Sequence, residues 1–143
     1  MGERCEQEAP LTKIFGQLYS HTRMQLITKV KTHSVDKMFK AFSDRTRLRI
    51  LHMLRNGEVC VCDLTRVLNV PQPKVSRHLS YLRKAGLVRV RKDGLWCYYK
   101  LSPAKTAFHK KLLECLTCCF KDVPEVRRDA IRLKSVCSSR CCE

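Results

Sequence analysis

The chain has 143 residues, of which 29 are lysine or arginine and 13 are aspartate or glutamate, so its formal charge is +16. This length fits one domain with extensions, and 44% apolar residues exclude wholesale disorder. No apolar stretch approaches the roughly 20 residues that a membrane helix needs, and residues 1–10 are polar and acidic, unlike a signal peptide. We therefore expect a soluble cytoplasmic protein without a membrane partner.

The pattern of the chain predicts three regions. The central region carries the densest helical and strand patterning, and the flanking regions extend it at both ends. The three regions are an N-terminal extension over residues 1–34, a central domain over 35–120 and a cysteine-rich C-terminal extension over 121–143. We expect a helix at Leu11–Val30 in the first region. In the third we expect a helix at Glu125–Leu133 and a mobile tail from Lys134.

The first half of the central domain predicts helices. Val35–Phe42 is amphipathic, and Asp44 is a suitable N-cap for a helix over Arg45–Arg55. Asn56 and Gly57 then end that helix.

A helix-turn-helix pattern follows Gly57. Its first helix spans Cys60–Leu68, its turn Asn69–Pro71, and its second helix Gln72–Ala85. In the second helix the apolar residues recur at helical spacing, which turns one face inward and leaves the opposite face free for a DNA groove. Gly86 stands where the residue after a helix end belongs.

Two strand-like runs, Leu87–Arg91 and Leu95–Leu101, come next and are separated by Lys92, Asp93 and Gly94. Asp-Gly between such runs predicts a hairpin, and a basic hairpin after a helix-turn-helix is typical of a winged helix. A helix over Ala104–Phe120 completes the domain with an apolar core or dimer face. The predicted fold is mainly helical with a small β-hairpin, a winged helix-turn-helix.

The charge distribution favours DNA as the partner. No acidic residue occurs over Leu64–Lys92, which suits contact with phosphates. The predicted DNA-binding residues lie on the second helix and the hairpin: Gln72, Lys74, Ser76, Arg77, His78, Arg89, Arg91 and Lys92. In the major groove Gln suits adenine and Arg suits guanine, whereas the hairpin residues suit backbone phosphates.

The ten cysteines are the second unusual feature. Most of them stand in close groups, and in a cytoplasmic chain such groups indicate metal, metalloid or redox chemistry more than a disulfide framework. The groups are the pair Cys60 and Cys62, the triplet Cys115, Cys118 and Cys119, and the tail group Cys137, Cys141 and Cys142, with Cys5 and Cys97 apart.

Four motifs resemble the ArsR/SmtB family of metal-responsive winged-helix repressors. They are A-F-S-D-R-T-R-L-R-I-L at Ala41–Leu51, E-V-C-V-C-D-L at Glu58–Leu64, P-Q-P-K-V-S-R-H-L-S-Y-L-R-K-A-G-L-V at Pro71–Val88 and G-L-W-C-Y-Y-K-L-S-P at Gly94–Pro103. The C-V-C-D-L box is similar to that of the arsenic- and antimony-responsive branch.

This resemblance implies a homodimer that binds double-stranded operator DNA without a cofactor and represses an arsenical resistance operon. Release follows when trivalent arsenic or antimony binds cysteine thiolates. Cys60 and Cys62 match the family's ligand pair, but Thr65 stands where relatives often have a third cysteine. A third thiolate must come from elsewhere.

Thiolates suit soft ions, and a trivalent metalloid is best bound by three of them. On a regular helix Cys60 and Cys62 lie ~200° apart, so chelation should unwind the first turn of the supporting helix. Further candidate ligands are Cys5, Cys97, the triplet Cys115, Cys118 and Cys119, and the tail group Cys137, Cys141 and Cys142. For Cys97 we expect a structural role.

Other functions remain open on the same scaffold. A zinc, cadmium or lead sensor is the nearest alternative, although the Asp and His pair that zinc-type relatives use is missing near Pro103–Lys105, and His109 is expected to be partly exposed. A thiol-redox repressor is the other alternative. We expect no enzyme activity, because no phosphate loop, H-E-x-x-H motif or nucleophile elbow occurs.

Overall fold

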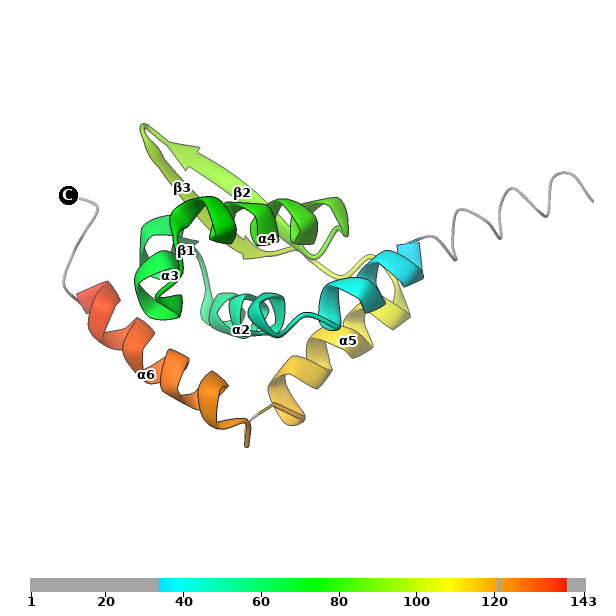
Figure 1. Ribbon diagram of the computed structural model, residues 1–143. Helices are drawn as coiled ribbons and strands as arrows, with labels where there is room; N and C mark the ends of the chain where they lie inside the picture. The colour runs from blue at the N-terminus through cyan, green and yellow to red at the C-terminus, as the bar shows by residue number, and fades with distance from the viewer. Residues whose placement is uncertain (1–33, 121, 139–143) are drawn as a thin grey trace, which may run out of the picture. The chain divides into compact units, whose positions relative to one another are not determined.

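The computed structural model describes residues 34–120 and 122–138. A helix covers 34–42 and is followed by α2 (Arg45–Met53), the 3₁₀ turn η2 (Leu54–Asn56), β1 (Val59–Cys60), α3 (Val61–Leu68), α4 (Gln72–Lys84), β2 (Val88–Asp93), β3 (Trp96–Leu101), α5 (Ala107–Cys118) and α6 (Pro124–Ser138) (Figure 1). The fold is therefore mainly helical with a small antiparallel sheet, as predicted. The predicted helix at Leu11–Val30 lies outside the described residues.

Helix α2 begins as the sequence predicts. The side chain of Asp44 accepts a hydrogen bond of 2.8 Å from the backbone N–H of Arg47, which is the N-cap arrangement. The Arg47 guanidinium donates in turn to the Ala41 carbonyl at 3.0 Å and lies 4.3 Å from the ring centre of Tyr81 on α4. One arginine thus ties α2 to the helix before it and to α4.

The helix-turn-helix pair is α3 and α4. Asn69 adopts a left-handed conformation (φ 53°) at the end of α3, which a short polar side chain tolerates and which turns the chain toward α4. Val75, Leu79 and Leu82 are fully buried, so the predicted inward face of α4 is confirmed. Gly86 takes a positive φ of 76° just after the helix, as its predicted position requires.

The sheet differs from the predicted simple hairpin in two ways. Its two-residue turn is Gly94–Leu95, because Asp93 still pairs with Trp96 and Gly94 supplies the positive φ of 55°. A third strand, β1, pairs with β3 and gives the order β1-β3-β2. We call the β2–β3 hairpin (residues 88–101) the wing.

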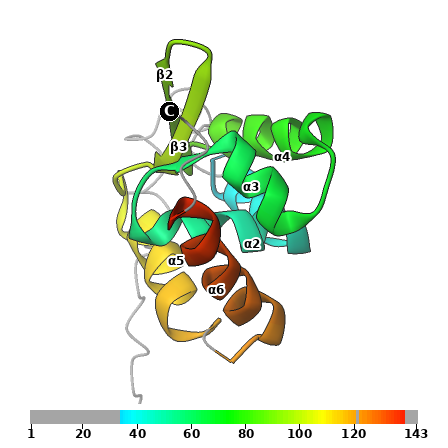
Figure 2. The same ribbon diagram turned by 90° about the vertical axis from the view of Figure 1, so that its left-hand side faces the viewer.

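The C-terminal helix α6 is longer than predicted and belongs to the packed fold. It runs to Ser138, so residues 134–138 are helical and not part of the mobile tail that we expected. It packs against α2 and α3, with Val126 only 3% exposed (Figure 2). Two ion pairs hold α6 against α2: Asp129 pairs with Arg49, and Glu125 pairs with Arg45.

The ion pair between Arg49 and Asp129 is the more buried of the two. Arg49 Nε and Nη2 donate to the two carboxylate oxygens of Asp129 at 2.6 and 2.8 Å, and the Asp129 side chain is 2% exposed. This bidentate bond raises the pKa of Arg49 further. Arg45 is 77% exposed, so its bond with Glu125 competes with water.

We expect Asp129→Asn to lower the free energy of unfolding by about 2–3 kcal/mol, because a partly buried guanidinium loses its charged partner. Urea unfolding followed by circular dichroism measures the change. The matched control is Glu125→Gln, which breaks the exposed pair on the same helix and should have a clearly smaller effect. Equal losses for the two variants would contradict the packing described for α6.

Candidate functional site

Helix α4 presents a polar face at its N-terminal half. Gln72, Lys74, Ser76 and Arg77 are exposed, whereas Val75 between them is buried. Both views place α4 and the wing on the same side of α2, with α6 on the other side (Figures 1 and 2). The two elements that carry the residues predicted to bind DNA, α4 and the wing, therefore lie on one side of α2.

His78 differs from these residues because its side chain points toward α2 and not toward solvent. Its side chain is 15% exposed, and its Nδ1 lies 3.5 Å from the Asp44 carboxylate that caps α2. Burial lowers the pKa of His78, although Asp44 opposes this effect. This position favours a role in packing α4 on α2 over a contact with DNA.

In the wing, Arg89, Arg91 and Lys92 are all exposed, and Arg91 is also held by its own chain. Its Nε donates to Glu58 at 3.1 Å, its Nη1 donates to Asp93 at 2.9 Å, and its guanidinium lies 4.7 Å from the ring centre of Tyr98. These carboxylates raise the pKa of Arg91, while Lys100 and Arg91 lower the pKa of Glu58. Arg91 therefore has structural partners in the wing in addition to its predicted contact with phosphates.

Cys60 and Cys62 lie on either side of the start of α3. Cys60 is the N-cap residue, has an extended backbone (φ −68°, ψ 146°) and is 2% exposed, whereas Cys62 is half-buried in the first turn. Both are thiols, not disulfides. Because Cys60 lies outside the helix, the angular separation expected for a regular helix does not apply to this pair.

These two sulfur donors fit a thiophilic metalloid in chemistry. The two thiols alone do not complete a three-ligand site. Among residues 34–120 and 122–138, no group of three His, Cys, Asp or Glu side chains is close enough together to hold a metal ion. What restrains Cys60 is the sheet, since β1 pairs it with Tyr98. The candidate ligand pair therefore adjoins both β1 and the first turn of α3.

A second pair of thiols lies at the end of α5. The sulfur atoms of Cys118 and Cys119 are 3.4 Å apart and both residues are exposed, while Cys115 is half-buried. The neighbouring Cys119 thiol raises the pKa of Cys118. Cys97 packs partly buried against the core, as expected of a structural residue. Cys137 falls within α6, and Cys5, Cys141 and Cys142 lie outside the described residues.

His109 corrects a prediction from the sequence. It is 1% exposed and not partly exposed, because it lies in the first turn of α5, where Nδ1 accepts the backbone N–H of Lys105 at 3.4 Å. Burial, with the charge of Lys105, lowers its pKa.

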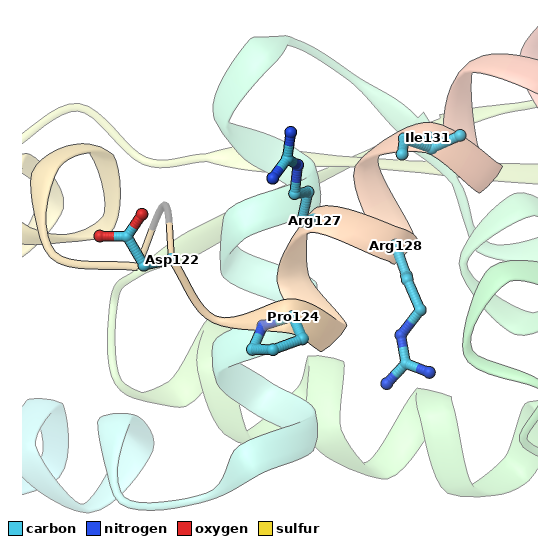
Figure 3. A pocket seen from close by; sticks show the side chains of 5 residues that line it. All are labelled: Asp122, Pro124, Arg127, Arg128 and Ile131. Carbon is cyan, nitrogen blue, oxygen red and sulfur yellow. The ribbon is translucent and has the colours of Figure 1, made fainter.

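A surface pocket near the start of α6 is lined by Asp122, Pro124, Arg127, Arg128 and Ile131 (Figure 3). The two arginines point away from each other, so their guanidinium groups do not converge on one anion. In the described part of the chain no helix is long and apolar enough to cross a membrane.

The architecture of α3, α4 and the wing agrees with comparisons to known proteins. Residues 44–90 match the family described as bacterial regulatory protein, arsR family. The chain is 47% identical over 79 residues to the arsenical resistance operon repressor of Escherichia coli K12. The alignment covers 54% of this chain and 68% of that protein. The chain belongs to the arsR family. Family members of this kind are transcriptional regulators that bind DNA, and not enzymes.

Other known proteins are also similar to this chain in sequence or in structure. A cadmium resistance regulatory protein CadC homolog of Staphylococcus aureus is 38% identical over 52% of this chain and 63% of its own length. The transcriptional regulator HlyU of Vibrio vulnificus has a similar structure, with 31% identity, a TM-score of 0.53 and coverage of 68% of this chain and 98% of that chain. The homodimeric winged helix-turn-helix domain of Mb0332 from Mycobacterium bovis shares the fold at 22% identity, with a TM-score of 0.55, covering 72% of this chain and 85% of that chain.

We expect Arg77→Ala to weaken operator binding by about tenfold or more, because a major-groove arginine contact discriminates by roughly 1–3 kcal/mol. Fluorescence anisotropy with labelled operator measures it. Arg127→Ala is the matched control, since Arg127 is also exposed but lies on α6, on the other side of α2. Normal operator binding by Arg77→Ala would show that α4 is not the reading helix.

Proposed function

We propose that the chain is a cytoplasmic, metalloid-responsive repressor that binds operator DNA as a homodimer and leaves it when trivalent arsenic or antimony binds Cys60 and Cys62. The observation that carries the proposal is the place of these two thiols, at the start of the helix that supports α4. In this role DNA binding needs no cofactor, and the metalloid is the inducer.

The DNA-binding part of the proposal rests on charge and exposure. Gln72, Lys74, Ser76 and Arg77 form the reading face of α4, and Arg89 and Lys92 contact phosphates from the wing. Helix-turn-helix repressors read two half-sites through two copies related by a two-fold axis.

The dimer part rests on the helix at 34–42 and on α5. Phe39 is 55% exposed, and its ring lies 5.2 Å from that of Phe108 on α5, so both helices contribute to one apolar surface. Leu112 and Leu113 of α5 are only half-buried. A second copy of the chain covers this surface in the proposed dimer, which removes large apolar side chains from water.

The inducer part rests on donor chemistry and on the relatives. Soft thiolates select metalloid and other thiophilic ions over harder metals, and relatives at 47% identity are named for arsenical resistance. The third thiolate comes from another part of the chain or from the partner subunit; the candidates are Cys115, Cys118, Cys119, Cys137, Cys141 and Cys142.

Cadmium is the second candidate inducer, because it also prefers thiolates and a cadmium resistance regulator is among the relatives. A thiol-redox repressor is a third, and the close pair of Cys118 and Cys119 favours it.

The test is a titration of the reduced homodimer on its own promoter with arsenite, antimonite, zinc and cadmium. We expect arsenite and antimonite to release the DNA, and Cys60→Ser with Cys62→Ser to abolish the release without loss of DNA binding. Cys97→Ser is the matched control, because it removes a half-buried thiol from the neighbouring strand and should respond like the wild type.

Three outcomes would contradict this proposal. Release by arsenite that survives the double substitution moves the site to the α5 triplet or the tail group. Release by cadmium alone makes the protein a cadmium sensor. Release by an oxidant that reductant alone reverses makes it a redox switch.

A further inference from the structure

We propose that Glu58 is a positioning residue that ties the wing to the strand carrying Cys60, so that a ligand on Cys60 acts on DNA through the wing as well as through α4. This inference rests on the proposed function for the identity of the inducer. The tie itself is a property of the chain before any inducer binds.

The first observation is a row of side chains across the sheet. Cys60 in β1 is opposite Tyr98 in β3, and Tyr98 is opposite Arg91 in β2. Residues directly opposite each other in antiparallel strands point to the same face. The Arg91 guanidinium lies 4.7 Å from the ring centre of Tyr98. Cys60, Tyr98 and Arg91 therefore occupy neighbouring positions on one face of the three strands.

The second observation is that one carboxylate binds both strands of the wing. Glu58 Oε2 accepts from Arg91 of β2 at 3.1 Å, and Glu58 Oε1 accepts from Lys100 of β3 at 2.7 Å. Glu58 stands two residues before Cys60, directly ahead of β1. The wing is therefore attached at Glu58 and through the pairing of β1 with β3.

The third observation is how short β1 is. It consists of Val59 and Cys60 alone, paired with Tyr99 and Tyr98. A strand of two residues has little pairing of its own, so a ligand that pulls Cys60 toward Cys62 can displace it. A ligand shifts a conformational equilibrium only through contacts that differ between the two states, and the pairing of Cys60 is such a contact.

Two physical effects of Glu58 predict opposite results, which makes the proposal testable. If Glu58 only contributes charge, then removing its carboxylate makes the protein more positive and tightens DNA binding. If Glu58 positions the wing, then Arg91 and Lys100 lose their common partner, the wing becomes less ordered and operator binding weakens.

The experiment uses the full-length dimer with Glu58→Gln and, as matched control, Glu114→Gln. The control also removes one carboxylate and one lysine ion pair, that of Lys111 with Glu114 on α5. Operator affinity is measured without inducer. The order of the wing is measured by the fluorescence of Trp96, the only tryptophan of the chain, which pairs with Asp93 next to the wing turn.

We expect Glu58→Gln to weaken operator binding by about fivefold, at the low end of typical coupling between sites, and to shift the Trp96 emission in the DNA-free protein. We expect arsenite to change the Trp96 emission of the wild type and of Glu114→Gln, and to have little effect in Glu58→Gln. Unchanged or tighter operator binding by Glu58→Gln would overturn the positioning role.

Failure of this inference can be told apart from failure of the proposed function. If arsenite releases the wild type from DNA and leaves the Trp96 emission unchanged, the wing is not part of the response and this proposal is wrong. If arsenite does not release the wild type at all, the inducer is wrong, whereas the affinity of Glu58→Gln without inducer still decides the positioning role.

Discussion

The pairing of β1 with β3 is the constraint on which the arrangement of the thiols depends. It holds Cys60 in an extended conformation at the edge of the sheet, while the next residue already begins α3. Cys60 therefore belongs to the same sheet as the wing. It also directly precedes α3, the helix that supports α4. In the proposed mechanism, a change at Cys60 therefore acts on both α4 and the wing without a long chain of intermediate contacts.

Helix α2 provides the fixed frame for these elements. Arg47 joins it to the carbonyl groups at the end of the preceding helix and to Tyr81 of α4, and Arg49 joins it to Asp129 of α6. Its residues Ile50 and Leu51 are fully buried. Because α2 is held on both sides, we propose that it stays in place when β1 or α3 changes.

Much of this fold follows from local patterns in the sequence. Asp44 as a helix cap, the inward residues of α4 and the glycine after α4 are each set by chemistry within a few residues. The strand β1 could not be predicted in this way, because two residues carry no periodicity and their pairing partner lies in β3. The packing of α6 also depends on distant partners, such as Arg49 for Asp129.

The candidate site shows the same division. The sequence predicts the cysteine pair and the basic residues of α4 and the wing, because their types and spacing are visible locally. It does not show that Arg91 is held by Glu58 and Asp93, or that His78 faces Asp44, since both depend on contacts between separate elements. The signal in the sequence for these contacts was Glu58, a carboxylate just before the cysteine pair, together with the cations Arg91 and Lys100 in the wing.

Hydrogen exchange of the backbone amides in β1 and β3, with and without arsenite, tests the central claim most directly. The strand pairing of Cys60 with Tyr98 must yield if Cys60 joins a metalloid. We therefore predict that arsenite lowers the protection of residues 59–60 and 98–99 while the amides of α2 stay protected. Unchanged protection of these strand amides in protein that arsenite has released from DNA would contradict the account.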